Sequence, residues 1–349
     1  MFFGSKKVIG IDIGSSSIKL AELEQSRGKW ELQSFGFIPT PEHSMNGGEI
    51  TDVKRIAATI KHLVNQVKTK RKTVATSLWG TAVIVKKISI AKVDKKVLDE
   101  HIRFEAEQYI PFELSQVNLS YHILPTSVDP QSLDILLVAA QSDSTNHYIQ
   151  SIKSAGLDCQ ILDVGGLALA NCFEANYGKP TGEAIGLFNF GARVTNFVAI
   201  SQGEVIFCRD IPVGGANYTN EIHRLLQVTP AEAEALKMSA VAGHDVPDDV
   251  HSVMSATNDL IIEEIRNTID FLGASANGIA LSRCYYIGGS SVTTGLVQGL
   301  SSATGLYFEA MNPFLKVSAT KSFTPEYLQQ ISPYVGIVLG LAMRVGDQS

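Results

Sequence analysis

Residues 8–20, VIGIDIGSSSIKL, and residues 185–198, IGLFNFGARVTNFV, share one pattern that decides the fold. Each is an apolar run with one short polar residue that turns at a glycine, passes small residues and re-enters an apolar run. The two turn glycines, Gly14 and Gly191, lie 177 residues apart, about half of the chain. The pattern predicts a β-hairpin whose turn can hold a phosphate. Its repetition predicts a duplicated architecture that grips the phosphates of one nucleotide from both sides.

Composition sets the broad class of the protein. At 349 residues the chain exceeds the size at which one core stops growing, so two domains are expected. Hydrophobic residues make up 45% and charged residues 18%, which is typical of a globular protein. The net charge of −6 gives no reason to expect a nucleic-acid surface. We interpret the one basic run, KTKRK at 68–72, as a solvated helix end.

The patterns of cysteine, histidine and hydropathy indicate the cellular location of the protein and whether it binds zinc. The four cysteines lie far apart in apolar surroundings without CxxC spacing, which indicates buried, reduced thiols. The eight histidines show no metal-binding spacing, so we expect no zinc site. No apolar run approaches the roughly 20 residues that span a bilayer, and the N-terminal segment is not a secretory signal. We therefore expect a cytoplasmic protein that partners link to a membrane.

The predicted elements repeat along with the hairpins. Three antiparallel strands over 6–38, a helix over 50–68 and a strand at 73–79 are followed, later, by strands at 185–210 and helices from about 215. Between the copies, residues 83–141 predict a small α+β insert with a helix from Asp94 to Gln108. The predicted organisation is a first domain of 1–82 and 142–184, to which a C-terminal helix at 333–349 returns, an inserted subdomain of 83–141, and a second domain of 185–332.

The first hairpin offers phosphate and metal ligands. Asp12 ends a strand, where a carboxylate can hold the water shell of Mg²⁺. Gly14 permits a positive φ, and Ser15, Ser16 and Ser17 offer N–H and hydroxyl donors to phosphate oxygens. Alternatively, the glycine and the serines only form the turn.

The second hairpin differs in one position. Asn189 stands where the first copy has Asp12, and Gly191 and Thr195 follow. An amide keeps an acceptor oxygen but removes the negative charge, so Mg²⁺ is expected to bind less tightly here. Arg193 is either a phosphate ligand at the turn or a solvent-facing residue at its tip.

Further glycine turns follow in the second half. Gly288, Gly289 and Ser290 lie between a strand and a helix start, where a flat ring or a phosphate can approach the backbone. Gly214 and Gly215 form a similar turn. Glu234 and Lys237 lie one helical turn apart, which alone predicts a surface pair.

These segments occur in the order and approximate spacing found in the actin, Hsp70 and sugar-kinase superfamily. The chain resembles the FtsA branch and, within it, the PilM family of type IV pilus assembly proteins. The resemblance covers nearly the whole chain and rests on GIDIGSSSIKLAEL, EAEQYIPFELSQVNLSY, LDVGGLALAN, RDIPVGGANYTNEI and GIVLGLAMR. It implies an α/β, actin/Hsp70-like (ribonuclease H-like) duplicated two-domain fold with an FtsA-type inserted subdomain.

The resemblance also implies a site for ATP or ADP with Mg²⁺ in the cleft. It places Asp163 where hydrolytic relatives have an acidic residue near the attacking water; alternatively, Asp163 is a helix N-cap. Because relatives usually carry Asp at the position of Asn189, we expect ATP binding with slow or negligible hydrolysis. The implied nucleotide-binding residues are Asp12, Gly14, Ser15, Ser16, Ser17, Lys19, Asn189, Gly191, Thr195, Gly214, Gly215, Glu234, Lys237, Gly288, Gly289 and Ser290.

The implied partner is the cytoplasmic N-terminal tail of PilN, held in a groove between the insert and the first domain. Tyr109, Ile110, Pro111 and Phe112 form an apolar cluster suited to an extended peptide, or else anchor the insert. Pilus motor ATPases or the platform protein are further expected partners. Two other functions remain open: a small-molecule kinase of the same superfamily, and an FtsA-like filament-forming ATPase.

Overall fold

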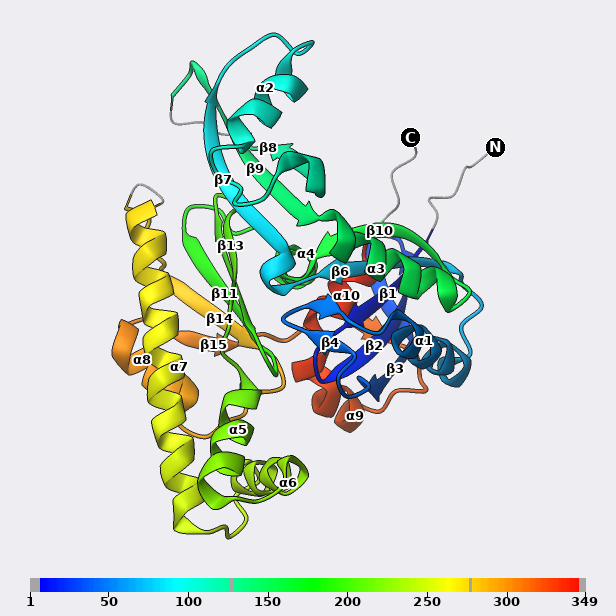
Figure 1. The fold of residues 1–349 in the computed structure, drawn as a ribbon, viewed down its shortest axis with the longest axis vertical. Helices are drawn as coiled ribbons and strands as arrows, with labels where there is room; N and C mark the ends of the chain where they lie inside the picture. Colours follow the sequence, from blue (N-terminus) through cyan, green and yellow to red (C-terminus); the bar gives the residue numbers. More distant parts are fainter. Residues whose placement is uncertain (1–6, 126–128, 276–277, 345–349) are drawn as a thin grey trace.

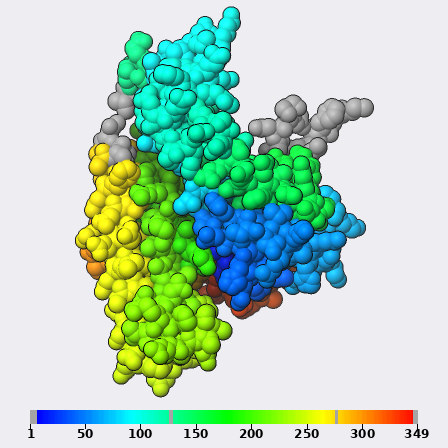
Figure 2. Space-filling view, viewed as in Figure 1, coloured from blue at the N-terminus to red at the C-terminus, as the bar shows by residue number. Residues whose placement is uncertain are grey.

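The computed structural model describes residues 7–125, 129–275 and 278–344. Two large β-sheets lie beside one another, and a smaller sheet projects at one end of the molecule (Figure 1). The space-filling view shows this smaller unit, in cyan, seated at that end (Figure 2).

The first sheet has the strand order β10-β6-β1-β2-β3-β16. The predicted three-stranded meander is confirmed: β1, β2 and β3 are antiparallel, while β6 and β10 run parallel to β1. Its strands are β1 (Ile9–Ile13), β2 (Ser17–Ser26), β3 (Lys29–Pro39), β6 (Thr73–Leu78), β10 (Asp158–Val164) and β16 (Val317–Ala319). Because β16 pairs with β3, the chain returns to this sheet before residue 333, where the sequence predicted the return.

Helices cover both faces of the first sheet. The helices α1 (Val53–Val67) and α3 (Ser142–Ser154) share a core with the isoleucines of β1. The other face holds α4 (Gly165–Tyr177) and α10 (Gly336–Ala342), shorter than the predicted closing helix. This contact requires glycine at two positions: a Cβ on Gly10 would lie 2.3 Å from Val338 O, and one on Gly340 would lie 1.7 Å from Ala168 O. Smaller elements nearby are β4 (Met45–Asn46), β5 (Glu49–Ile50) and α9 (Pro325–Ile331).

The second sheet repeats the design with the order β13-β12-β11-β14-β15. Again three antiparallel strands are followed by parallel ones. Phe188 and Phe197 stack across β11 and β12, with ring centroids 4.4 Å apart. The elements are β11 (Ala184–Phe190), β12 (Thr195–Ser201), β13 (Glu204–Ile211), β14 (Arg283–Ile287), β15 (Phe308–Ala310), α5 (Gly215–Leu226), α6 (Pro230–Val241), α7 (Asp248–Ser275) and α8 (Leu296–Thr304).

The insert forms its own sheet, in the order β7-β9-β8, with its own apolar core. Its elements are β7 (Val83–Ala91), α2 (Leu98–Ala106), β8 (Val117–Ile123) and β9 (Ser132–Gln141). The helix is shorter than predicted because a turn, in which Val97 N donates to Asp94 O, precedes it. The predicted strand over 118–128 ends at Ile123, and residues 126–128 lie outside the described part.

Two expectations from composition can be compared with the structure. All four cysteines are free, and three are buried, whereas Cys159 is half-buried. Burial raises the pKa of the Cys172 and Cys284 thiols to about 12 and that of Cys159 to about 11, so they stay protonated. Within the described residues, no helix combines the length and the apolar character needed to cross a membrane.

Candidate functional site

The two hairpin turns have the same geometry and face each other. Gly14 N donates to Ser17 O at 3.1 Å, and Gly191 N donates to Val194 O at 3.0 Å. Between them lies a small cavity of about 90 Å³. It is lined by Asp12, Gly14, Ser15, Ser16, Ser17, Lys19, Ser77, Trp79, Gly165, Asn189, Gly191, Ala192, Val194, Asn196 and Ile337. The structure thus brings together the phosphate-loop residues of both predicted copies, except Thr195.

The reason for glycine at these turns is not the one that the sequence suggested. Neither Gly14 nor Gly191 has a positive φ, so the prediction for Gly14 is wrong. Space decides instead, because a Cβ on Gly14 would lie 3.0 Å from Ser17 O and one on Gly191 would lie 2.7 Å from Val194 O. Glycine therefore permits the close backbone approach that closes each turn.

In the first copy, a buried ion pair forms across the hairpin. Asp12 and Lys19 are opposite each other on β1 and β2, and Lys19 Nζ donates to Asp12 Oδ2 at 3.0 Å. Asp12 is 6% exposed. The lysine offers a positive charge to phosphate oxygens, but it also neutralises the one carboxylate that lines the small cavity among the described residues.

In the second copy, a chain of hydrogen bonds replaces the ion pair. Asn189 Nδ2 donates to Asn196 Oδ1 at 2.7 Å, and Asn196 Nδ2 donates to Asp210 Oδ1 at 2.6 Å. Asp210 Oδ2 accepts from Gly80 N at 2.6 Å, which joins the second sheet to the segment that leaves the first. Burial raises the pKa of Asp210, while the bonds from Gly80 and Asn196 act to lower it. Sequence reasoning missed Asn196 and Asp210, although Asn196 lies 177 residues after Lys19.

The glycine turns of the second half meet at Gly191. Gly215 N donates to Gly191 O at 3.0 Å, and Ser290 Oγ donates to the same oxygen at 2.9 Å. A Cβ on Gly214 would lie 2.5 Å from Gly191 O, so a larger residue would separate these loops. Lys237 Nζ donates to Gly215 O at 3.4 Å and to Glu234 Oε2 at 2.7 Å. This group therefore adjoins the second hairpin turn, as a site that extends from the phosphates to a nucleoside requires.

Gly288 and Gly289 form the next turn of this site. Gly288 has a φ of 110°, and a Cβ there would lie 2.4 Å from the backbone of Phe190. A Cβ on Gly289 would lie 2.7 Å from the ring of Tyr334. Both positions thus need glycine to let β14 turn beside the second hairpin.

Besides the residues of these glycine turns and the pair Glu234 and Lys237, Thr195 and Asp163 do not line the small cavity either. Thr195 is fully buried, and its hydroxyl donates to Val213 O at 2.9 Å, so it ties β12 to the turn before α5. Asp163 Oδ2 accepts from Arg344 Nε at 2.7 Å, and its other oxygen accepts from Val164 N. The N-cap of α4 is Val164, so the alternative assignment of Asp163 as that cap is wrong.

The residues fit an anionic nucleotide better than a bare metal ion. The described residues contain no group of three or more His, Cys, Asp or Glu side chains that could hold a metal. Mg²⁺ is commonly held by one or two carboxylates together with substrate phosphates. Asp12 is the carboxylate of that kind in the small cavity and is paired with Lys19, whereas Asn189 supplies only a neutral amide.

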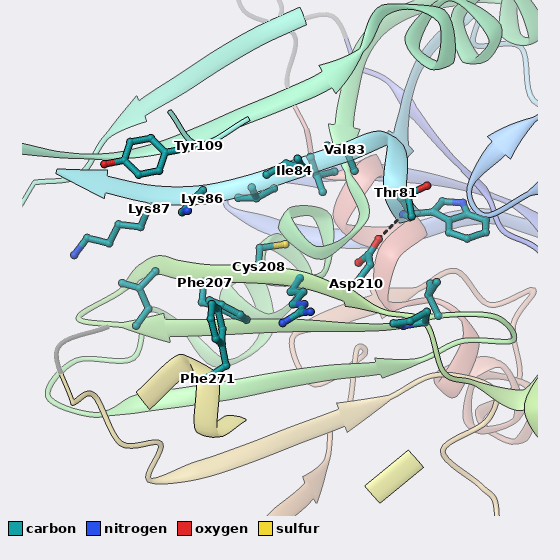
Figure 3. A pocket seen from close by; sticks show the side chains of 18 of the residues that line it. Thr81, Val83, Ile84, Lys86, Lys87, Tyr109, Phe207, Cys208, Asp210 and Phe271 are labelled. Carbon is teal, nitrogen blue, oxygen red and sulfur yellow. Dashed lines mark hydrogen bonds between the residues drawn. The ribbon is translucent and has the colours of Figure 1, made fainter. Parts of the chain in front are cut away.

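A second, much larger cavity of about 1320 Å³ lies between β7 of the insert and β13 of the second sheet (Figure 3). Trp79, Gly80 and Thr81 also line it, and Asp210 lies at this end. The resemblance implied a groove between the insert and the first domain; residues of both line this cavity, but one of its walls belongs to the second sheet. We call this cavity the β7–β13 groove.

The predicted partner-binding cluster divides between the groove and the insert. Tyr109 lines the groove, with Lys86 Nζ 4.6 Å from its ring centroid. Ile110 is 6% exposed and belongs to the core of the insert, and Phe112 packs against that core. Pro111 is exposed. The anchoring role that the sequence left open therefore applies to Ile110 and Phe112.

Comparisons with known proteins agree with this architecture. The family model described as Type IV pilus assembly protein PilM matches residues 10–346. The solved PilM-PilN type IV pilus biogenesis complex is similar over 97% of this chain and 98% of that chain, with 26% identity and a TM-score of 0.87. The ethanolamine utilization protein EutJ from Carboxydothermus hydrogenoformans has 15% identity and a TM-score of 0.56 over 96% of this chain and 89% of that chain.

Two further relatives support the same fold. MreB5 of Spiroplasma citri, solved with ADP, has 13% identity and a TM-score of 0.50 over 89% of this chain and 93% of that chain. The cell division protein FtsA of Streptococcus pneumoniae is 22% identical over 254 residues, 66% of this chain. That match spans 55% of the FtsA chain. The predicted actin-like, duplicated two-domain α/β fold is confirmed.

Proposed function

Because the chain belongs to the PilM family of type IV pilus assembly proteins, we propose that it is an ATP-binding scaffold of the inner-membrane assembly complex. It holds the cytoplasmic N-terminal tail of PilN and links PilN to the pilus motor ATPases or the platform protein. The protein is cytoplasmic and reaches the inner membrane through these partners.

The β7–β13 groove is the observation that supports partner binding most directly. Its volume of about 1320 Å³ exceeds the roughly 300–1,000 Å³ of small-molecule pockets, so it suits a peptide. Its walls come from the insert and the second sheet, and aromatic side chains from both walls line it. Tyr109 is the member of the predicted cluster that a docked tail contacts.

The nucleotide site is proposed from the paired hairpin turns. ATP or ADP lies with its phosphates between Gly14–Ser17 and Gly191, and Lys19 faces the phosphates. Glu234, Lys237 and Ser290 lie toward the nucleoside. Since the small cavity of about 90 Å³ is below the usual size of a ligand site, the two sheets must part to admit the nucleotide.

Hydrolysis is proposed to be slow or absent. The cavity offers one carboxylate, Asp12, and Lys19 neutralises it. The second loop supplies the amide of Asn189, which cannot compensate for the missing charge. Asp163, which resemblance placed near the attacking water, is engaged by Arg344 at 2.7 Å.

Calorimetric titration of a synthetic PilN tail against the full chain tests partner binding. We expect Tyr109→Ala to weaken binding at least about tenfold, since aromatic anchors contribute much of an interface's energy. Phe37→Ala is the matched control, because Phe37 is a 54% exposed aromatic residue on β3, outside the groove. Equal affinity of Tyr109→Ala and wild type would remove the tail from this groove.

Measuring the steady-state rate of ATP hydrolysis tests the proposal that hydrolysis is slow or absent. Wild type is expected to turn over ATP well below about 1 per second, the low end of typical enzymes. Turnover of several per second that Asp12→Ala abolishes would contradict a scaffold that holds its nucleotide intact.

A further inference from the structure

Both walls of the β7–β13 groove hold a cation against an aromatic ring. On the β7 side, Lys86 Nζ lies 4.6 Å from the centroid of the Tyr109 ring. On the β13 side, the guanidinium carbon of Arg209 lies 5.7 Å from the centroid of the Phe271 ring. Figure 3 shows Lys86 and Tyr109 on one side and Phe271 on the other. A cation–π contact orients a cation but leaves its charge in place.

These cations differ from the other charged groups of the groove. Lys87 forms an ion pair with Asp134 at 2.8 Å, and Asp210 accepts hydrogen bonds from Gly80 N and Asn196. Within the parts of the chain that the structure describes, neither Lys86 nor Arg209 has a carboxylate oxygen within 4.0 Å of its side-chain nitrogens. Four cations, Lys86, Lys87, Arg193 and Arg209, and three carboxylates, Asp129, Asp134 and Asp210, line the groove, which gives it a small excess of positive charge on a protein whose net charge is −6.

We infer that the β7–β13 groove selects an extended peptide segment in which carboxylate side chains alternate with apolar ones. The carboxylates pair with Lys86 and Arg209, and the apolar side chains pack on Tyr109 and Phe271. An extended chain directs successive side chains to opposite sides, so one segment reaches both walls. This inference rests on the proposed function in taking the groove as the partner site, and it adds the chemistry of the partner.

The mixture of charged and apolar residues that line the groove favours a peptide over a nucleic acid. A phosphate backbone repeats its charge at every step and requires a row of cations. Here three carboxylates line the groove together with its four cations, and the lining also has an apolar and neutral surface, including Val85, Phe207 and Cys208, which a peptide can cover.

Fluorescence anisotropy with three synthetic ten-residue peptides tests the inference on the full chain. The peptides have leucine at alternate positions and Glu, Gln or Lys at the others. We expect the Glu peptide to bind about tenfold or more tightly than the Gln peptide, and the advantage to shrink as salt rises from about 50 to about 500 mM. The Lys peptide should bind more weakly than either. Equal binding of the Glu and Gln peptides, or equally tight binding of a ten-nucleotide oligothymidylate, would overturn the inference.

Matched variants locate the effect. In Lys86→Gln with Arg209→Gln, the Glu peptide should lose its advantage while the Gln peptide binds as before. Lys61→Gln with Arg224→Gln removes the same charges from exposed positions on α1 and α5, and should leave the advantage intact. All four side chains are exposed, so the variants should fold, which thermal unfolding verifies. If both double variants lose the advantage equally, net charge explains it and the inference fails.

The same variants separate this inference from the proposed function. A Glu peptide that binds as expected while the PilN tail does not bind would remove PilN and keep the groove chemistry. A PilN tail that binds wild type and the Lys86→Gln, Arg209→Gln variant equally would keep the partner and remove the acidic recognition.

Discussion

Lys19 donates to Asp12 at 3.0 Å across the first hairpin, and the positions 177 residues later hold Asn196 and Asn189, joined by a hydrogen bond of 2.7 Å. The duplicated hairpins thus keep their geometry but exchange an ion pair for an amide pair. The exchange leaves Asn196 free to donate to Asp210, so the second copy connects its loop to the β7–β13 groove. The two halves of the cleft have different electrostatic roles.

The amide pair predicts the cost of restoring the carboxylate. Asn189→Asp would place an acceptor against Asn196 Oδ1, and rotating the Asn196 amide would only turn that oxygen toward Asp210. We expect a loss of about 1–3 kcal/mol in the free energy of unfolding, measured with urea. Adding Asn196→Lys, which recreates the pair of the first hairpin, should recover most of it. Asn267→Asp, at an exposed position on α7, is the control and should change little.

The sequence predicted the hairpins because the pattern of apolar residues and glycine is local. It could not show that Thr195 turns its hydroxyl to Val213, because side-chain direction depends on the turn that β13 makes afterwards. Asp163 pairs with Arg344, 181 residues away, and no local pattern reports such a contact. Asn196 is different: the repeat interval of 177 residues identifies it once Lys19 is known to face Asp12. The three-residue β16 is too short for a period-two pattern to reveal.

Asp210 predicts a specific pH dependence. Burial raises its pKa above the ordinary 3.8. At a pH between 3.8 and the raised pKa, the folded protein therefore binds a proton that the unfolded chain has released. Its contribution to stability is therefore fully present below about pH 4 and is lost as the pH rises through the raised pKa. Urea unfolding of wild type and Asp210→Asn from about pH 4 to about pH 7 should show wild type losing stability relative to the variant as pH increases. A difference that stays constant with pH would contradict this assignment.

A glycine at the contact between α10 and α4 should tolerate alanine much less well than a glycine on α7. Gly340→Ala would place a Cβ 1.7 Å from Ala168 O, so the closing helix must move away from the first sheet. We expect a loss of about 3 kcal/mol or more in the free energy of unfolding. Gly273→Ala on α7 has its nearest neighbour at 4.0 Å and a helical backbone, so it should be neutral or stabilise by up to about 1 kcal/mol. Chemical denaturation of both variants measures the contrast, which similar losses would contradict.

Lys237 predicts a loss of nucleotide affinity without a loss of stability. Its ammonium contacts Gly215 O, Thr219 Oγ1 and Glu234 Oε2, beside the second hairpin turn. Lys237→Met keeps the aliphatic stem and should weaken ATP binding about tenfold, as expected when a charge-assisted contact is removed. Arg224→Met removes a comparable helix pair, with Glu221, on the exposed surface of α5 and serves as the control. Calorimetry with ATP on both variants decides, and equal affinities would exclude Lys237 from the site.

The hydrogen bonds from Asn189 through Asn196 and Asp210 to Gly80 predict that the two cavities are coupled. Asn189 and Asn196 line the small cavity, while Gly80 and Asp210 line the groove, and Trp79 lines both. A nucleotide that parts the sheets must shift these hydrogen bonds. ATP should therefore change the affinity for the PilN tail by about fivefold or more in wild type. Asn196→Ala removes the middle of the chain and should bring that factor close to one.

The control for this last experiment needs to be another buried asparagine. Asn176 is fully buried, its side chain donates to Cys172 O and accepts from Lys316 N, and it lines neither cavity. Asn176→Ala should lower stability to a similar degree and leave the coupling factor unchanged. Titrating the tail with and without ATP in both variants separates the two effects. If Asn196→Ala keeps the wild-type factor, communication does not pass through these hydrogen bonds, whatever the affinity of either ligand.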